Sequence, residues 1–401
     1  MFAVSPIATP RQITLRSVMG ILLERGAISR AEVARLTGLS KQTMSEVFKD
    51  LETEGWVQLS GRTQGAVGRS AATYEVRTDR ALVFGAEVGG TRMTAAIASM
   101  DGTILSEAME PTDQRGGDCV VEQLARLHRE LAARAEIPAD RVLVGTIGIP
   151  GAYDPRSKTL RMVPNITGLE GYPIAERLSA AVAFEVQVDN NVNMAAKGEQ
   201  WLGEGKDVDN FVFVAVGTGI GMGVINERRV LRGARGAAGE IAILPIGANA
   251  YDSRTFRAGA LETMIGSTAI RARYESSGGA PGLTVLQIID RIAEGDRIAI
   301  ATLDELARTL AEAILAVSAV VDPARVILGG STGARVELLA RVQHYLPLCM
   351  TAPPPCTISQ LGSRAGLYGT LATSLELLRE RLFQLPNYHP VLTALPTETA
   401  L

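Results

Sequence analysis

The first eighty residues of this 401-residue chain carry hydrophobic side chains at helical spacing. Between positions 12 and 25, apolar side chains recur three and four residues apart, at Leu15, Val18, Met19 and Leu22. This spacing places them on one face of an amphipathic helix, and Gly26 ends the helix because glycine readily adopts the backbone conformation needed there. The pattern predicts a first helix from about Gln12 to Arg25.

Two shorter helices are predicted around a glycine turn. The order Ser29-Arg30-Ala31-Glu32 predicts a capping box, in which the serine hydroxyl and the glutamate carboxylate bind free amide groups at the start of the second helix. That helix ends near Thr37-Gly38, and Ser40 caps a third helix. The inward stripe of the third helix is Met44, Val47 and Leu51, and its outward face is Lys41, Gln42, Ser45, Glu46 and Lys49. This is the pattern of a helix-turn-helix.

Residues 56–59 and 72–76 read as two strands joined by the turn-rich segment GRTQGAVGRS, which predicts a wing. In this geometry the third helix enters the major groove, where Gln42 and Ser45 bond base edges, Lys41 meets phosphate or guanine, and Arg69 of the wing enters the minor groove. The predicted DNA-binding residues are Ser40, Lys41, Gln42, Thr43, Ser45, Lys49 and Arg69. The alternative is a small helical protein-interaction module with a solvated charged face.

The charge distribution favours nucleic acid as the partner of this segment. Residues 11–77 hold ten Lys or Arg against seven Asp or Glu, a net charge of +3, whereas the whole chain has −3 and the remainder therefore −6. A basic segment is attracted to the phosphates of DNA.

From Ala81 onward the pattern changes to short apolar runs separated by glycine turns. The runs are ALVFGAEV, TAAIAS, VLVGTIGI, FEVQVD, FVFVAVG and RVILGG, with helical stretches such as 120–135 and 303–321 between them. Strands alternating with helices over this length predict an α/β architecture. A chain of 401 residues also exceeds what one compact core usually holds, so at least two domains are expected.

Glycine turns follow the predicted strands at three places: Gly89-Gly90-Thr91, Gly217-Thr218-Gly219 and Gly329-Gly330-Ser331. Such turns let backbone amides approach phosphate oxygens because no side chain is in the way. One such turn is more often a simple chain reversal, but three of them favour phosphate binding. Their spacing matches neither a Walker loop nor a dinucleotide fingerprint.

Polar residues gather at the end of one apolar strand, in VDNNVNMAAKGE. Asn190, Asn191 and Asn193 are candidates for bonding sugar hydroxyls, since an amide both donates and accepts, whereas helix capping accounts for only one of them. Glu240 and Glu262 stand amid small and apolar residues, and act either as ligands or as ordinary ion-paired acids.

The remaining composition excludes several classes of protein. The three cysteines and three histidines do not cluster at ligand spacing, which argues against a structural zinc or a disulfide framework. No segment approaches the roughly twenty apolar residues that span a bilayer, and MFAVSPIATPRQ lacks the features of a signal peptide. A cytoplasmic protein without membrane contact is expected.

These motifs together resemble the ROK family, which groups repressors of sugar operons with bacterial sugar kinases. Residues 26–57 read GAISRAEVARLTGLSKQTMSEVFKDLETEGWV and resemble the winged helix-turn-helix of its regulators. The motifs EVGGTR, IGIPGAYD, VPNITG, DNNVNMAAKGE, GTGIGMGV, GARGAAGEI and VILGGS then follow in the order of the family. The resemblance covers almost the whole chain.

The resemblance implies an actin-like, two-lobed sugar-kinase fold of the α/β class, preceded by a winged helix-turn-helix domain. The implied domains are 1–78 for DNA binding, 79–188 for a first lobe completed by a helix around 363–382, and 189–362 for a second lobe with an oligomerisation surface. The implied sugar-binding residues are Gly151, Asn165, Asn190, Asn191, Glu240 and Glu262. Nucleotide phosphates would lie at Gly89, Gly90, Thr91, Gly217, Thr218, Gly219 and Gly330. Homodimers or homotetramers, which suit palindromic operators, are also implied.

The sequence departs from the family's kinases at the positions that perform phosphoryl transfer. Where the kinases have Asn-Asp, with the Asp taking the proton of the attacking sugar hydroxyl, this chain has Asn190-Asn191, and an amide is not a base near neutral pH. Glu87 and Arg92 replace the Asp and Lys of the phosphate motif. The family's zinc ligands are replaced by Ile243, Ser253, Thr255 and Ala260.

We therefore expect a repressor of a sugar-uptake or catabolism operon that binds operator DNA and a monosaccharide or derivative. It is expected to have lost kinase activity and to use no zinc, ATP or magnesium. Two alternatives remain open: an active ATP-dependent sugar kinase that also binds DNA, and a DNA-bound protein whose C-terminal part only oligomerises or docks a partner.

Overall fold

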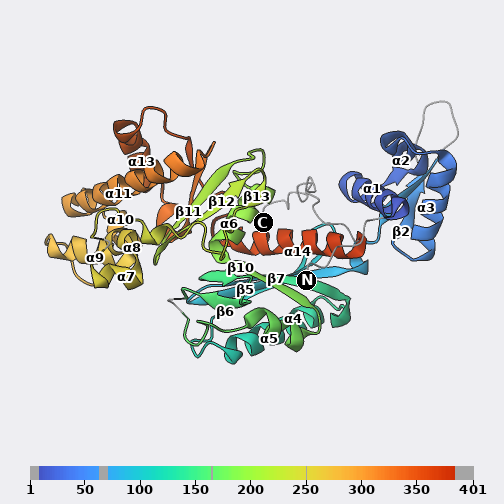
Figure 1. Cartoon of the computed structure of the whole chain (residues 1–401), viewed down its shortest axis with the longest axis horizontal. Coiled ribbons are helices and arrows are strands. Elements are labelled where there is room, and N and C mark those ends of the chain that lie inside the picture. The colour runs from blue at the N-terminus through green and yellow to red at the C-terminus, as the bar shows by residue number, and fades with distance from the viewer. Residues whose placement is uncertain (1–8, 63–70, 164–165, 250, 384–401) are drawn as a thin grey trace.

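The computed structural model describes residues 9–62, 71–163, 166–249 and 251–383. Figure 1 shows an elongated molecule with three parts. A small helical domain forms one end, and two larger lobes, each built around a sheet, form the rest. The long helix α14 (Ala365–Phe383) runs between the lobes toward the small domain.

The winged-helix domain has the three predicted helices and the two predicted strands of the wing, while residues 63–70 between these strands lie outside the described residues. Its elements are α1 (Pro10–Arg25), β1 (Ile28–Ser29), α2 (Arg30–Thr37), α3 (Lys41–Thr53), β2 (Val57–Arg62) and β3 (Ala72–Val76). The strands form an antiparallel sheet in the order β1-β3-β2, of which the two-residue β1 was not predicted. The core contains the predicted stripes together with Val33, Phe48 and Tyr74. The periodicity of the sequence was therefore a correct guide to this domain.

The caps of these helices follow the sequence with one correction. The hydroxyl of Ser29 accepts the N–H of Glu32, but the Glu32 carboxylate binds the guanidinium of Arg35, so the predicted capping box is only half formed. An arginine one turn later offers a charge-assisted bond, which is stronger than a bond to a backbone amide. A complete capping box forms instead at α1, between Thr9 and Gln12, where none was predicted.

The first lobe is a five-stranded sheet in the order β10-β7-β4-β5-β6. The strands are β4 (Leu82–Val88), β5 (Arg92–Ser99), β6 (Ile104–Pro111), β7 (Val142–Ile149) and β10 (Glu185–Asn190). Side chains alternate between its faces, so Leu82 and Phe84 meet α4 (Asp118–Arg134) and α5 (Ile174–Val182), whereas Val83 meets α14. A hairpin of β8 (Ala152–Asp154) and β9 (Thr159–Arg161) follows β7.

The second lobe has its own sheet, in the order β13-β12-β11-β14-β15. The strands are β11 (Phe211–Val216), β12 (Ile220–Asn226), β13 (Arg229–Val230), β14 (Val326–Gly329) and β15 (Cys356–Ile358). One face packs on a layer of helices: α8 (Ala260–Ile265), α9 (Ser267–Ser276), α10 (Val285–Asp290), α11 (Arg297–Val321) and α13 (Val336–Cys349). The other face packs on α6 (Asn191–Leu202).

The two lobes meet through helices rather than through their sheets. Helix α6 lies on the second sheet, α14 lies on the first, and the two helices cross each other. Short elements complete the chain: α7 (Ser253–Ala258), α12 (Gly330–Gly333) and the 3-10 turns at Thr78–Arg80, Ala139–Arg141, Ile241–Ile243 and Gly362–Arg364. The expected α/β, two-lobed architecture is confirmed, while the exact domain limits stay a prediction. No helix in the described ranges is long and apolar enough to cross a membrane.

Candidate functional site

The outward face of α3 has the exposure required of a DNA-reading helix. Lys41, Gln42, Ser45 and Lys49 are exposed, while the opposite face of the helix is buried. The Gln42 amide donates to Glu46 at 3.3 Å and the Ser45 hydroxyl to the carbonyl of Lys41 at 3.0 Å, bonds that both side chains can exchange for bonds to DNA. Neither lysine forms an ion pair with a described residue.

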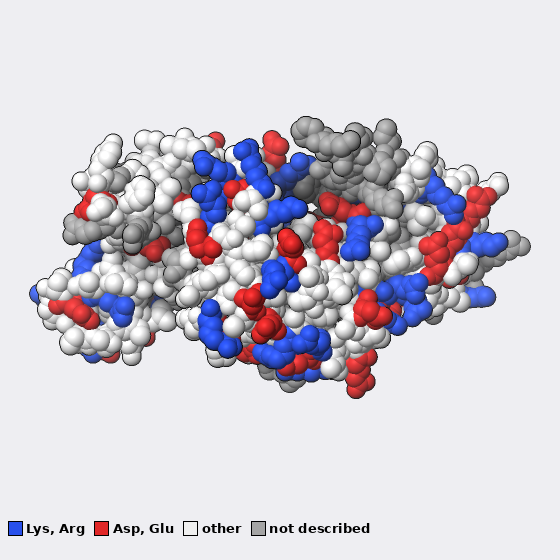
Figure 2. Space-filling model, turned by 60° about the horizontal axis from the view of Figure 1, so that its bottom comes forward, with Lys and Arg blue, Asp and Glu red and all other residues white. Residues whose placement is uncertain are grey.

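Two of the remaining predicted DNA-binding residues, Ser40 and Thr43, also have a structural role at the start of α3. The hydroxyl of Ser40 accepts the N–H of Thr43 at 3.1 Å and lies 2.9 Å from the Thr43 hydroxyl, so both residues also build the start of α3. Arg69 lies outside the described residues. On the face shown in Figure 2, acidic and basic side chains are mixed over the end of the molecule that carries this domain. The structural evidence for DNA binding is therefore the exposed face of α3.

The predicted sugar site is centred on the junction of β10 and α6. The Asn190 side-chain oxygen accepts the N–H groups of Val192 and Asn193, at 2.7 and 3.3 Å, and its amide donates to the carbonyl of Gly151 at 2.9 Å. Two predicted site residues, Asn190 and Gly151, are thus brought together. The helix-capping alternative is correct for Asn190, and its role toward sugar stays a prediction.

Asp189, the carboxylate next to this junction, is fully engaged. One of its oxygens accepts the Asn190 N–H at 2.7 Å and the Asn193 amide at 2.9 Å, and the other accepts the guanidinium of Arg232 at 2.7 Å. The residue is only 7% exposed. Its carboxylate therefore connects the start of α6 with Arg232. The sequence interpretation missed Arg232, because nothing local marks an arginine in the run RRVLRGAR as the partner of an acid far earlier in the chain.

Asn191 occupies the first position of α6 and is partly exposed. Its side chain forms no hydrogen bond with a described residue. The backbone of Gly148, at the end of β7, lies close to it, since a Cβ on Gly148 would be 3.3 Å from the Cα of Asn191. Asn165, also predicted to bind sugar, lies outside the described residues.

Glu262 connects the predicted sugar site to the second glycine turn. Its carboxylate accepts the N–H of Ile220 at 3.2 Å, and a Cβ on Gly219 would lie 2.5 Å from the same oxygen. Burial raises the pKa of Glu262, and burial together with the negative charge of Glu262 raises the pKa of Glu240. The two predicted acids therefore share one environment.

Two of the three glycine turns lie together at one edge of the second sheet, and the third belongs to the first sheet. Strands β11 and β14 are parallel, so the turns that follow them lie at the same sheet edge, where Gly217 is in contact with Ser331 and Gly330 with the backbone of Val216. Thr218 is fixed by its carbonyl, which accepts the N–H of Ser267 at 3.1 Å. The third turn, at Gly89 to Thr91, belongs to the other sheet and joins β4 to β5.

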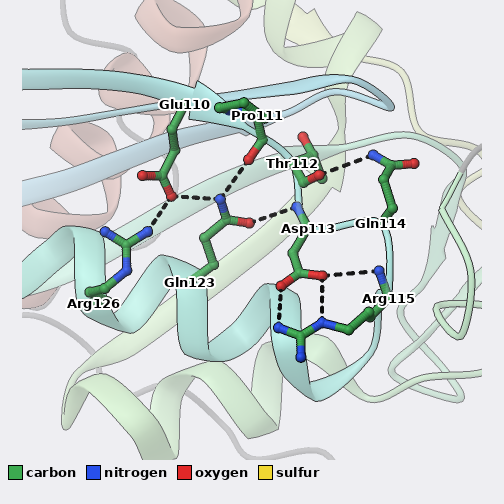
Figure 3. Close-up of polar contacts among 8 residues, drawn as sticks. All are labelled: Glu110, Pro111, Thr112, Asp113, Gln114, Arg115, Gln123 and Arg126. Atoms are coloured by element: carbon green, nitrogen blue, oxygen red, sulfur yellow. Dashed lines mark hydrogen bonds and ion pairs between the residues drawn. The ribbon is translucent and has the colours of Figure 1, made fainter.

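The segment after β6 holds the Gly89 to Thr91 turn in place, and the sequence interpretation missed it. The Thr112 hydroxyl donates to the carbonyl of Gly89 at 2.7 Å, and the Gln114 amide donates to the carbonyl of Gly90 at 2.9 Å. Figure 3 shows how this segment is itself held, by Gln123 and by the two-pronged pair of Asp113 with Arg115. The Arg115 guanidinium lowers the pKa of Asp113 to about 2.

Glu87, which replaces the family's Asp before this turn, is directed to α14. Burial raises its pKa to about 7, although nearby Arg92 and a hydrogen bond from the Leu367 N–H both act to lower it. A Cβ on Gly366 would lie 2.3 Å from the carboxyl carbon of Glu87. The longer side chain thus contacts the first turn of α14.

Comparison with known proteins identifies the two parts of the chain. A model described as ROK family matches residues 83–376, and one described as winged helix-turn-helix DNA-binding matches residues 11–58. The chain belongs to the ROK family. The predicted resemblance, including its combination of a ROK domain with a winged helix, is confirmed.

ROK relatives of both functional kinds are similar to this chain. A putative xylose repressor from Caldicellulosiruptor sp. is 29% identical over 264 residues, which span 65% of this chain and 65% of the repressor, just under two thirds of its length. A glucokinase from Thermotoga maritima is 27% identical over 319 residues, 75% of this chain and 98% of the kinase. A crystal structure titled as a ROK family transcriptional regulator, homolog of the E. coli MLC protein, covers 93% of this chain and 98% of its own, with 21% identity and a TM-score of 0.76, which shows the fold.

The residues at the positions where the resemblance implies the family's zinc ligands lie between the turn at Ile241–Ile243 and the start of α8. Ile243 is 57% exposed and precedes a loop leading to α7 and α8, where Ser253, Thr255 and Ala260 lie. The Thr255 hydroxyl donates to the carbonyls of Asn249 and Asp252, both at 2.8 Å. Within the described ranges, no three His, Cys, Asp or Glu side chains are grouped to hold a metal ion. Backbone hydrogen bonds hold this segment together.

Proposed function

We propose that this protein is a cytoplasmic, sugar-responsive repressor that binds operator DNA through α3 and a monosaccharide or derivative through its ROK domain. The observation that carries the proposal is the winged helix, with Lys41, Gln42, Ser45 and Lys49 exposed together, joined to a ROK domain. Asn191, at the position where the resemblance implies the kinases' base, supports it. The alignment with a putative xylose repressor supports it.

The test combines effector binding with DNA binding. Purified protein is screened by thermal shift against D-xylose, D-glucose, other monosaccharides and their phosphates, because a ligand of the folded state raises its melting temperature. Operator affinity, measured by fluorescence anisotropy on the promoter next to the gene, is expected to fall about tenfold with the sugar that binds, which requires only about 1.4 kcal/mol of coupling. A sugar that raises the melting temperature and leaves operator affinity unchanged would contradict the proposal.

The sugar is proposed to contact Gly151, Asn165, Asn190, Asn191, Glu240 and Glu262. The hydrogen bond of Asn190 to Gly151 and the shared environment of Glu240 and Glu262 support this assignment. Replacing Asn191 by Ala should abolish the thermal shift without changing the melting temperature of the free protein, because the Asn191 side chain forms no hydrogen bond with described residues. An unchanged thermal shift would remove Asn191 from the site.

We also propose that the protein does not phosphorylate the sugar and needs neither zinc nor magnesium-ATP. The support for this proposal is Asn191, whose amide offers no base, and Asp189, whose carboxylate is occupied by hydrogen bonds from Asn190, Asn193 and Arg232. A coupled ADP assay should find no turnover, and Asn191→Asp should raise any background by about 100-fold or more, the usual contribution of a general base.

An active sugar kinase that also binds DNA is the second candidate. The alignment over 98% of the Thermotoga maritima glucokinase and the retained glycine turns favour it. Sugar-dependent turnover by the unmodified protein would establish it.

The third hypothesis is a C-terminal part that only oligomerises or docks a partner. It would be supported if calorimetry detected no binding of sugar. Light scattering tests the proposed homodimer or homotetramer.

A further inference from the structure

The N-terminal end of helix α14 contacts β4, the strand that leads into the Gly89 to Thr91 turn. The first turn of α14 lies against the carboxylate of Glu87, the last but one residue of β4. Gly366 makes room for this contact, because a Cβ there would overlap the carboxylate. The start of α14 is therefore fixed by a residue of the predicted phosphate motif.

One turn later α14 crosses α6 with backbone against backbone. A Cβ on Gly369 would lie 1.7 Å from the carbonyl oxygen of Met194, and one on Gly198 would lie 2.1 Å from that of Ala365. No side chain separates the helices at this point, so a shift of α6 cannot be absorbed by a rotamer change. Since α6 begins directly after Asn190, a shift at the predicted sugar site reaches α14.

A buried ion pair joins the same two helices further along. The Lys197 ammonium lies 2.8 Å from the Glu376 carboxylate, and the two side chains are only 8% and 21% exposed. The ammonium also donates to Gln200 at 2.9 Å. Removing one partner of such a pair strongly destabilises the folded protein, because the other charge is left buried and uncompensated.

One continuous hydrophobic cluster joins α14 both to the first lobe and to the winged-helix domain. Leu371, Leu375 and Leu378 are buried in the same hydrophobic cluster as Val18 and Met19 of α1. Glu380, one turn after Glu376, is close enough to Arg16 of α1 for the positive charge to act on it. The Arg80 guanidinium, at the joint between domain and lobe, lies 5.4 Å from the centre of the Trp56 ring.

We propose that α14 transmits sugar binding to the DNA-binding domain, with Lys197 and Glu376 as the positioning residues that lock α14 to α6. This inference rests on the proposed function for the identity of the signal. Sugar that moves the start of α6 shifts α14 along with it, and α14 then changes the orientation of α1 and with it the placement of α3. Neither Lys197 nor Glu376 needs to touch sugar or DNA.

The first arm of the test needs no sugar. Full-length Glu376→Gln and Lys197→Met are compared with Asp304→Asn, which breaks a similar pair, Arg341 to Asp304 at 2.8 Å, between α11 and α13 of the second lobe. Amide hydrogen exchange in α1 should become several-fold faster in the first two variants and stay unchanged in the control. Unchanged exchange in α1 of all three would overturn the inference.

A double variant separates position from stability. Lys197→Met combined with Glu376→Leu replaces the pair by apolar side chains, a change that often preserves folding. If the double variant keeps the wild-type melting temperature and still shows faster exchange in α1, loss of the polar lock is responsible. If its exchange returns to the wild-type rate, general loosening explains the single variants and the inference fails.

The second arm adds D-xylose and D-glucose as probes. In the wild type, the ratio of operator dissociation constants with and without the active probe should be about ten, and in Glu376→Gln it should fall to below about three, with the probe still bound by calorimetry. A ratio equal to that of the wild type would overturn the inference. If neither probe nor any other panel sugar shifts the wild type, the proposed function fails, and the exchange arm still decides the mechanical link.

Discussion

The winged-helix domain and the ROK domain use their polar residues in opposite ways. On α3 four of the residues predicted to bind DNA, Lys41, Gln42, Ser45 and Lys49, are exposed, and the hydrogen bonds of the Gln42 and Ser45 side chains stay within the helix. In the ROK domain two of the predicted residues are tied to the structure, since Asn190 caps α6 and Glu262 accepts the N–H of Ile220. Their neighbour Asp189, which was not predicted, accepts the Arg232 guanidinium. The predicted Asn191 is the exception, because its side chain forms no hydrogen bond with a described residue.

This difference shows how the two surfaces can serve one regulator. A surface that binds DNA must present several side chains to the groove at the same time. Exposed side chains on one rigid helix provide such a surface. An effector site must instead be connected to the rest of the fold if its occupation is to have a distant effect. The hydrogen bonds of Asn190 connect that site to α6, and α6 in turn packs against α14.

The largest expected effect tests whether the two regions are one cooperative unit. Gly369→Ala places a methyl group against the carbonyl of Met194, so α6 and α14 must separate, and we expect a loss of about 3 kcal/mol or more in the free energy of unfolding. Since α1 shares the core with α14, the winged helix should unfold in the same denaturant transition. The control is Gly61→Ala, whose Cβ would meet only the Thr73 hydroxyl at 3.6 Å. If the winged-helix domain stayed folded after the ROK domain had unfolded, the two regions would be independent folding units.

The next largest effect breaks the comparison from the DNA side. Reversing both charges in Lys41→Glu with Lys49→Glu should weaken operator binding by about 100-fold or more, because two phosphate contacts become repulsions. The thermal shift produced by the active sugar should not change. Lys206→Glu, an exposed lysine of the ROK domain, serves as the control in the same anisotropy titration. An equal loss in the control would place the DNA elsewhere.

A third test uses pH on the ROK side. Glu87 has a pKa of about 7 in the folded chain against its ordinary 4.5, so the folded state binds more protons than the unfolded state between these values. The free energy of unfolding therefore falls as pH rises through this window, by about 3 kcal/mol at most, and the decrease ends above the folded pKa. Glu87→Gln should remove this part of the slope in urea titrations. Parallel profiles for the two proteins would contradict the assignment, and the raised pKa values of Glu240 and Glu262 act equally in both.

The sequence predicted what is decided by neighbours along the chain. The helices of the winged-helix domain, the cap at Ser40 and the cap at Asn190 all follow from residues within one turn of each other. The bond from Arg232 to Asp189 and the bonds from Thr112 and Gln114 to the first glycine turn join residues on different elements. Periodicity carries no information on such pairs, because many arginines and amides share the same local pattern.

The smallest effect compares two caps of the same kind. The Ser40 hydroxyl accepts the N–H of Thr43 at the start of α3, and the Thr284 hydroxyl accepts that of Gln287 at the start of α10. Each change to alanine should cost about 1 kcal/mol of stability in urea titrations. Only Ser40→Ala should also weaken operator binding, by a few-fold, because it loosens the helix end that meets the DNA. If Thr284→Ala weakened operator binding equally, operator affinity would depend on the overall stability of the protein. The idea that the α3 surface is organised independently of the ROK domain would then be refuted.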